Sequence, residues 1–309
     1  MRKRLFGPYG DTHSNAKVLL KRYGIKVKPV DIRSRQIGKL VHGCDLVIHA
    51  ASQPSHPRSI EIPILDGSIN INGTLNLLEA TRKAARDATF LFCSTNKVYG
   101  ENVHNLPVVE KEKRFDYAEG IEGVDESMSV DHTLHTPFGV SKLAADTYCQ
   151  EYARLYGLPT AIFRLSCITG PAAKAVEAQN WEPYFILKNL KGERLNVYGY
   201  KGKQVRDVID ARDLVEAFDA FIRAPRPGEV YNMGGGRDNS ISLLESFELI
   251  ESLTGRKMIY ELQPKREGDH MIYISNLQKF RRHYPKWHMS YDIKTIFTDL
   301  HKVIQSQLR

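Results

Sequence analysis

Two segments of the sequence carry side chains that could work together in catalysis. In the first, Cys93 to Gly100, an apolar run ends in a polar turn that holds the hydroxyl of Thr95. In the second, Pro137 to Lys142, a helix begins, and positions 138 and 142 lie one turn apart on the same face of it. A hydroxyl at the end of a strand that faces a lysine on a helix is a candidate catalytic constellation.

The elements that must position this pair alternate between strands and helices. Short apolar runs predict buried strands at 44–51, 88–93 and 159–164. Apolar residues at helical spacing predict helices at 70–86 and 140–156. Alternation of this kind favours a parallel sheet covered on both faces. Because ligands bind such sheets at the carboxyl ends of the strands, we expect a ligand site where these strands end.

The flanking parts of the chain are less regular. We expect further helices at 15–23, 181–190, 213–223, 242–254 and from 292, and further strands at 25–30, 195–198, 208–209, 229–232 and 271–274. A long polar stretch from 101 to 136 separates the hydroxyl turn from the lysine helix. A loop of this kind inside a compact domain tends to be functional.

Composition and charge exclude several classes of protein. No apolar run approaches the ~20 residues needed to span a bilayer, and the basic start is not followed by the apolar core of a secretory signal, so we expect a cytoplasmic protein. The net charge of +8 is spread over the 309 residues, which favours a solvated surface over nucleic-acid binding and would also suit a nucleotide ligand. The four cysteines are scattered and the eleven histidines lack metal-ligand spacing, so we expect free thiols and no metal site.

Several further segments occur in one order along the chain. They are Asp31-Ile-Arg33, His49-Ala-Ala51, Asn72 to Ala80, Ser94 to Gly100, Ser141-Lys142, Phe163-Arg164, Gln204 to Asp207 and Asn232 to Gly235. In this order they resemble the extended short-chain dehydrogenase/reductase superfamily, the NAD-dependent nucleotide-sugar epimerases and dehydratases. Within it, Gln53 to His56, Ser94 to Gly100 and Gly202 to Asp207 are most similar to the CDP-paratose 2-epimerase (CDP-tyvelose epimerase) subfamily.

The resemblance implies an α/β fold with a doubly wound parallel sheet of the Rossmann type and a smaller α/β substrate lobe. Residues 1–165 would form the NAD-binding domain, to which residues 205–228 return. Residues 166–204 and 229–309 would form the nucleotide-sugar lobe. This division is an expectation of the family likeness, since no linker or repeat marks it in the sequence.

The resemblance also implies a chemistry for the opening pair. A bound NAD would oxidise a sugar carbon to a ketone and return the hydride to the other face. This needs a base for the hydroxyl proton, a cation that lowers the pKa of that base, and a hydroxyl that shares the proton. Thr95 would be the hydroxyl that touches the reacting sugar oxygen, and Lys142 would be the cation.

The family pattern further assigns residues to the ligands. Those expected at the cofactor are Asp31 and Ile32 beside the adenine, Ala50 and Ala51 beneath the cofactor, Asn72 in support of the active-site strand ends, and Lys142 at the nicotinamide ribose. Arg206 and Arg266 are expected to clamp the diphosphate of a nucleotide-sugar substrate, work that suits the fork of a guanidinium. A homo-oligomer is expected on the same ground.

One position departs from the family pattern at the point of the chemistry. Four residues before the lysine the family has a tyrosine whose phenol is the acid/base, and this chain has Phe138. A phenylalanine ring cannot exchange a proton, and loss of a general acid/base usually lowers the rate by ~10²–10⁴. His132, His135 or Tyr99 could take over the role if one of them reaches the site.

A second departure lies at the start of the chain. The family has a strand, a glycine turn for the pyrophosphate and a helix there, whereas this sequence has neither Gly-x-x-Gly-x-x-Gly nor Gly-x-Gly-x-x-Gly near its start. The likeness begins at about Met1, so we expect an N-terminally truncated Rossmann domain, with Met1 either internal to a longer protein or following a lost first unit. Without that unit the strand at 44–51 would be an exposed edge.

Hypotheses from different classes stay open on these grounds. One is an NAD-dependent epimerase of the CDP-sugar 2-epimerase type, and its rival is a catalytically silent paralogue that binds a nucleotide sugar. A nucleotide-sugar 4-epimerase or 4,6-dehydratase is a third, although dehydration normally needs an Asp-Glu pair where Asn96-Lys97 stands. Outside the site, Gly234 to Gly236 predict a tight turn and Asp213 predicts a helix cap.

Overall fold

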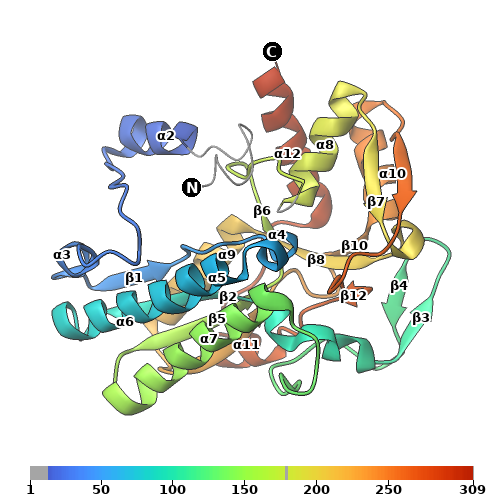
Figure 1. Cartoon of the computed structure of the whole chain (residues 1–309). Helices are drawn as coiled ribbons and strands as arrows, with labels where there is room; N and C mark the ends of the chain where they lie inside the picture. The colour runs from blue at the N-terminus through green and yellow to red at the C-terminus, as the bar shows by residue number, and fades with distance from the viewer. Residues whose placement is uncertain (1–12, 178–179, 309) are drawn as a thin grey trace.

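The computed structural model describes residues 13–177 and 180–308, and its main layer is a parallel sheet (Figure 1). The strands follow the order β1 (Leu46–His49), β2 (Thr89–Thr95), β5 (Thr160–Leu165) and β9 (Glu229–Met233). Each neighbouring pair is parallel, so each connection must cross over the sheet, usually through a helix. The predicted parallel sheet is therefore confirmed.

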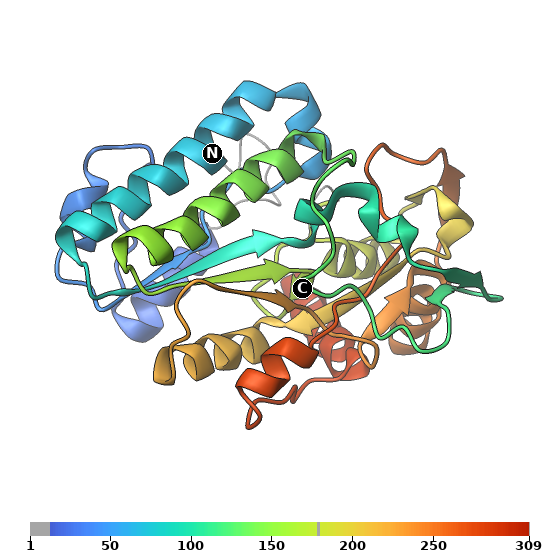
Figure 2. The ribbon, with the colours of Figure 1, turned by 90° about the horizontal axis from the view of Figure 1, so that it is seen from below.

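Helices cover both faces of this sheet (Figure 2). On one side lie α6 (Gly73–Ala84) and α7 (Thr136–Tyr156), and on the other α9 (Ala211–Arg223) and α11 (Gln278–His283). Side chains alternate along β2, because Phe90 and Phe92 pack with the α6 and α7 side whereas Leu91 packs with the α9 side. The unbroken apolar run that predicted this strand reflects burial on two faces.

Smaller sheets form a second lobe beside the main sheet. At its centre, β8 (Val205–Asp210) pairs with β6 (Cys167–Thr169), β10 (Ser240–Ser242) and β12 (Ile272–Tyr273). A separate pair joins β7 (Leu195–Tyr198) to β11 (Tyr260–Gln263). These strands share a core with α8 (Trp181–Lys191), α10 (Leu243–Thr254) and α12 (Ile293–Leu308). The lobe agrees with the smaller α/β unit that the resemblance implies.

Strand pairing places two segments differently from the expected division at 205–228 and 229–309. Residues 205–210 form β8 in the second lobe, and residues 229–233 form β9 in the main sheet. Between them, α9 packs on the main sheet through Leu214 and Phe218. The chain thus crosses between the lobes at both ends of α9, which an apolar pattern alone does not indicate.

Several short elements were not predicted. Before α6 the chain forms α4 (His56–Glu61), α5 (Pro63–Gly67) and a π-helical turn (Ser68–Asn72). The long polar stretch contains the end of a 3₁₀-helical segment (Asn96–Asn105) and a hairpin of β3 (Val108–Glu110) and β4 (Phe115–Tyr117). Among the described helices, none combines the length and apolar character that crossing a membrane requires.

The predicted strand at 25–30 is wrong. These residues link α2 (His13–Tyr23) to α3 (Ile37–Val41) without regular structure, and nearly all of them are exposed. A strand needs a neighbour for its main-chain groups, and no described strand pairs with this segment. Pro29 also removes one donor.

β1 lies at the edge of the main sheet in the described part of the chain. It pairs with β2, and its outward residues Leu46 and Ile48 are 37% and 48% exposed. Val47 and His49 point to the other face and are buried. The exposed edge expected for this strand is present among the described residues.

Candidate active site

The carboxyl ends of β1, β2 and β5 meet at one edge of the main sheet, beside the start of α7. A cavity of about 500 Å³ opens there, which we call the strand-end cavity. Its lining includes Ala50, Ser52, Thr95, Phe138, Lys142 and Ser166. The opening lies where the alternation of strands and helices predicts a ligand site.

Lys142 reaches this cavity from the second turn of α7. Its Nζ donates a hydrogen bond of 2.6 Å to the main-chain oxygen of Cys93 and lies 4.1 Å from the centre of the Phe92 ring. Burial lowers the pKa of Lys142 to about 8, although Cys93 and Asp146 act in the opposite direction. An ammonium group has three N–H donors, so the bond to Cys93 leaves others for a ligand.

Phe138 lies one turn before Lys142 and lines the same cavity. Its main-chain N–H donates to Ser59 Oγ at 3.0 Å, which satisfies one of the free donors of the first helical turn. Thr95 faces it from the end of β2, where its hydroxyl accepts a hydrogen bond of 3.3 Å from the main-chain N–H of Lys97. The structure therefore brings Thr95, Phe138 and Lys142 to one cavity, and the ring of Phe138 has no proton to exchange.

A buried polar network fixes the start of α7 over the cavity. Asn70 Nδ2 donates to Ser141 Oγ at 3.0 Å, and Asn70 Oδ1 accepts from the Gln53 N–H at 2.8 Å. Ser141 and Gln53 both donate to Asp66, whose pKa burial raises while these donors act against the rise. The support expected of Asn72 thus comes from Asn70. Asn72 lies exposed at the end of the π-helical turn, and its contact with the cofactor stays a prediction.

A buried ion pair fixes the end of β2 from within the sheet. Arg164 Nε and Nη2 donate to the two carboxylate oxygens of Asp146 at 3.0 and 3.2 Å. Ser94 Oγ donates to the same carboxylate at 2.7 Å. Because Ser94 directly precedes Thr95, this ion pair holds the strand end that presents the threonine hydroxyl.

The three substitutes considered for the missing phenol do not line the strand-end cavity. Tyr99 is buried, its hydroxyl accepts from Arg164 at 3.1 Å and donates to Asn232 at 2.7 Å, and burial raises its pKa to about 12. His135 Nε2 bonds to a loop carbonyl at 2.7 Å. His132 is exposed in the same loop. The structure therefore assigns the proton to none of these three.

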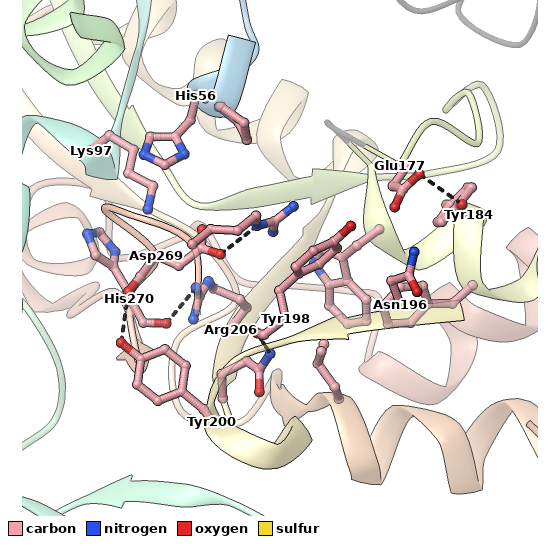
Figure 3. A pocket seen from close by; sticks show the side chains of 16 residues that line it. His56, Lys97, Glu177, Tyr184, Asn196, Tyr198, Tyr200, Arg206, Asp269 and His270 are labelled. Atoms are coloured by element: carbon pink, nitrogen blue, oxygen red, sulfur yellow. Dashed lines mark hydrogen bonds and ion pairs between the residues drawn. The ribbon is translucent and has the colours of Figure 1, made fainter. Parts of the chain in front are cut away.

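A second cavity of about 200 Å³ lies between the strand ends and the second lobe (Figure 3). We call it the cation cavity, because Arg206 and Arg266 both line it. Arg206 Nη2 donates to the main-chain oxygen of His270 at 2.7 Å. Arg266 Nε donates to Asp269 at 2.9 Å, and its guanidinium lies 4.4 Å from the centre of the Tyr198 ring. The structure thus brings the two predicted diphosphate-binding arginines together.

Positive charge dominates the inner end of the cation cavity. Burial acts to raise the pKa of Asp269, but the nearby Arg266, Lys97 and Arg206 together bring it below its usual value. Lys97 Nζ donates to the main-chain oxygen of Gly268 at 2.8 Å. Three cations around one carboxylate leave an excess of positive charge, which suits an anionic group such as a diphosphate.

Lys97 and His56 line both cavities, so the two cavities adjoin, and together we call them the cleft. In Figure 3 both side chains point from the same wall toward Asp269 and Arg206. Sequence reasoning gave neither of them a role. The signal for Lys97 was its place two residues after Thr95, whereas His56 begins α4, a helix too short for its pattern to be recognised.

The residues expected at the adenine lie outside both cavities, on the loop before α3. Asp31 accepts two hydrogen bonds from the Arg33 side chain, at 2.9 and 2.7 Å, and one of 2.9 Å from the main-chain N–H of Arg33, and these bonds lower the pKa of Asp31 to about 2. The side chain of Ile32 lies against Gly73, where a Cβ would approach it to 2.5 Å. The adenine contacts of Asp31 and Ile32 stay predictions.

Two predictions outside the cleft have different outcomes. The turn Gly234 to Gly236 packs tightly, since a Cβ on Gly235 would lie 2.3 Å from a main-chain oxygen. Asp213 does not cap α9, because Asp210 does so, and Asp213 instead accepts hydrogen bonds from the N–H groups of Ser290 and Tyr291. Within the described residues no cluster of three or more potential metal ligands occurs, and all four cysteines are free.

Comparison with known proteins adds sequence likeness to this geometry. Residues 7–234 match the model of the NAD dependent epimerase/dehydratase family. The chain is 37% identical to CDP-paratose 2-epimerase of Salmonella typhi over 242 residues, which is 76% of this chain and 70% of that protein. It is 30% identical to a putative UDP-glucose 4-epimerase of Methanocaldococcus jannaschii over 247 residues, 79% of this chain and 73% of that protein.

Solved structures show the same fold. UDP-glucuronic acid 4-epimerase from Bacillus cereus, in complex with UDP-glucuronic acid and NAD, has a TM-score of 0.80 and 22% identity, and the match covers 96% of this chain and 86% of that one. UDP-glucose 4-epimerase from Thermotoga maritima, with UDP-glucose, has a TM-score of 0.78 and 23% identity, with 97% and 96% covered.

Proposed function

This chain belongs to the NAD dependent epimerase/dehydratase family, and we propose that it is an NAD-dependent epimerase of a CDP-sugar, acting at C2. The observation that carries the proposal is the single cleft. At one end Thr95 and Lys142 line the strand-end cavity, and at the other Arg206 and Arg266 line the cation cavity. The likeness to CDP-paratose 2-epimerase supports the choice of nucleotide and carbon.

The residues at the strand ends fit the nicotinamide half of the cofactor. NAD, when bound, accepts a hydride from the sugar carbon and returns one to it. Ala50 and Ala51 are small and exposed beyond the end of β1, which allows close approach of a ligand. Lys142 holds donors beyond its bond to Cys93, and these would bind the nicotinamide ribose. Thr95 would hydrogen-bond the reacting sugar oxygen.

The cation cavity fits the nucleotide half of the substrate. Arg206 and Arg266 would bind the diphosphate through charge-assisted hydrogen bonds. Beyond them the lining turns aromatic, with Trp181, Tyr184 and Phe185 contributed by α8. Aromatic faces stack on nucleobases, so this end would hold the cytosine. The sugar would then lie between the two cavities, beside Thr95.

Conversion of CDP-paratose by the purified protein tests the proposal. We expect epimer formation by the wild type in the presence of NAD, followed by separation of the two CDP-sugars. Lys142→Met should lower the rate at least ~10²-fold, whereas Lys279→Met should not change it, since Lys279 lines neither cavity. UDP-glucose serves as the competing substrate. Conversion of UDP-glucose alone would contradict the choice of CDP-sugar and favour a 4-epimerase.

Phe138 favours a second candidate, a catalytically silent protein that binds a nucleotide sugar. That candidate predicts CDP-sugar binding in a calorimeter with no epimer formed at any NAD concentration. A protein that binds CDP and converts no CDP-paratose would overturn the epimerase proposal in its favour. A homo-oligomeric assembly, expected from the resemblance, and a cytoplasmic location, expected from the composition, stay predictions.

A further inference from the structure

Epimerisation by oxidation leaves one proton without an acceptor in this cleft. The sugar hydroxyl loses its proton as the carbon loses a hydride, and the group that would take the proton in the family is replaced by Phe138. Lys142 is held under β2 by Cys93 O and the Phe92 ring. With the remaining donors of Lys142 assigned to the nicotinamide ribose, the proton needs a further acceptor among the residues that line the cleft.

Lys97 lies where it can accept the proton of the sugar hydroxyl. It follows Thr95 by two residues, and the two are joined by the hydrogen bond from the Lys97 N–H to the threonine hydroxyl. Its side chain lines the strand-end cavity and the cation cavity at once. Figure 3 shows the Lys97 side chain on the side of the cation cavity that faces Arg206. The sugar of a substrate whose diphosphate meets Arg206 and whose reacting oxygen meets Thr95 would pass beside this amine.

We infer that Lys97 is the general acid/base of this epimerase, in place of the tyrosine that Phe138 replaces. The inference rests on the proposed function. In the oxidation, the O–H bond of the sugar alcohol breaks and its proton passes to the neutral amine of Lys97, while two electrons and one hydrogen leave the carbon as hydride to NAD. The alcohol becomes a ketone and the amine becomes an ammonium. The reduction returns the hydride to the other face and the proton from Lys97 to the oxygen.

The surroundings of Lys97 bring the pKa of its amine close to neutral pH. Burial, with Arg206 and Arg266, lowers the pKa of Lys97 to about 7, although Asp269 and Cys167 act in the opposite direction. The His56 ring also faces it, and burial together with Lys97 lowers the pKa of that ring to about 4. A general base works best with a pKa close to the working pH.

His56 is the other group that lines both cavities, and its geometry is less suited to the role. Its Nε2 is buried and points at Gly268, where an added Cβ would lie 2.6 Å away. The main chain at Gly268 therefore closes this nitrogen off from a substrate. Lys97 donates to the same residue through a single bond to the carbonyl oxygen, which leaves its remaining donors directed elsewhere.

Paired variants test the role of Lys97. Lys97→Met removes the amine and keeps most of the aliphatic chain. Lys279→Met is the matched control, because Lys279 Nζ also donates to a main-chain carbonyl at 2.8 Å but lines neither cavity. Phe138→Tyr restores a phenol one turn before Lys142, and the double variant K97M/F138Y asks whether that phenol can replace the amine. Each variant is assayed for CDP-paratose conversion and for CDP binding by calorimetry.

The inference expects a distinctive pattern. Lys97→Met should slow conversion by ~10²–10⁴ while CDP affinity changes less than about tenfold, because Lys97 donates to the Gly268 carbonyl and the diphosphate is assigned to Arg206 and Arg266. The double variant should recover at least tenfold of the lost rate, and the control should match the wild type. A Lys97→Met variant with unchanged rate overturns the inference. If Lys97→Met lowers the rate only as much as it lowers CDP affinity, and the double variant K97M/F138Y recovers no rate, Lys97 binds the anion and is not the general acid/base.

A chemical readout separates this inference from the proposed function. An acylating reagent at trace concentration labels neutral amines, and mass spectrometry follows Lys97 and Lys279 in the same sample. We expect half-maximal labelling of Lys97 near pH 7, about three pH units below the usual lysine value of about 10.4, and protection by CDP. A wild type without epimerase activity contradicts the proposed function, whereas Lys97 labelling at an ordinary lysine pH contradicts the general base.

Discussion

We expect the protein to lose much of its stability when one partner of the ion pair between Arg164 and Asp146 is removed, because the other charge then stays buried without a partner. The two side chains are 8% and 0% exposed, and the carboxylate also accepts from Ser94 at 2.7 Å. Asp146→Ala leaves the Arg164 guanidinium buried without a counter-charge, which costs about 3–5 kcal/mol. That is a large share of the roughly 5–15 kcal/mol by which a domain is stable. We expect the urea midpoint to fall accordingly, with the transition followed by circular dichroism.

The same helix provides the control for this measurement. Glu151 pairs with Arg154 at 2.9 Å on α7, but these side chains are 41% and 64% exposed, so Glu151→Ala should cost about 0.2–1 kcal/mol. A double replacement of Asp146 and Arg164 by Leu and Met should recover most of the loss, because no buried charge then stays unpaired. An Asp146→Ala variant as stable as Glu151→Ala would refute the reasoning.

Further predictions follow from buried groups in other parts of the chain. Glu182 is buried, and burial raises its pKa to about 8. Because the folded state then holds the proton more tightly than the unfolded state, wild-type stability should fall relative to that of Glu182→Gln as the pH rises from 4.5 to 8. Parallel curves of Tm against pH for the two proteins would contradict this. Gly235→Ala should cost about 1–3 kcal/mol through overpacking against a main-chain oxygen, whereas Gly38→Ala, with open space around the Cβ position, should be neutral or stabilising in the same melt. Arg206→Leu should weaken CDP binding about 10–100-fold by calorimetry, as expected for a lost charge-assisted bond, and equal losses in the exposed Arg194→Leu would show a nonspecific charge effect.

The sequence was sufficient for elements whose pattern is local. The run Phe90 to Phe92 predicted β2 because residues buried on both faces leave no polar alternation. Apolar spacing and Gly157 in the left-handed conformation at the end of α7 likewise make that helix readable from sequence. These two elements carry Thr95 and Lys142, which is why the sequence could predict that this candidate pair lies at one site.

The elements that sequence reasoning misplaced depend on contacts with distant parts of the chain. The apolar character of β8 and β9 indicates that they are buried, but it does not indicate which sheet each strand joins. The strands that pair with them come from segments far along the chain. Asn70 and Asn72 illustrate the same limit on a smaller scale. Both lie in the π-helical turn Ser68–Asn72, in which Asn70 is buried against Ser141 and Asn72 is exposed.

The replacement at Phe138 changes the chemistry required of the residues around it. With a phenol at this position, Lys142 would stabilise the phenolate and so share in the proton transfer; beside a phenyl ring, its donors can only hold a ligand in place. The proton must then move where the two cavities adjoin, at Lys97, which lies near Arg206, Arg266 and Asp269. These residues also suit a diphosphate, whose negative charge would raise the pKa of Lys97. Substrate binding would therefore favour the ammonium form of Lys97, the form that returns the proton to the sugar oxygen in the reduction.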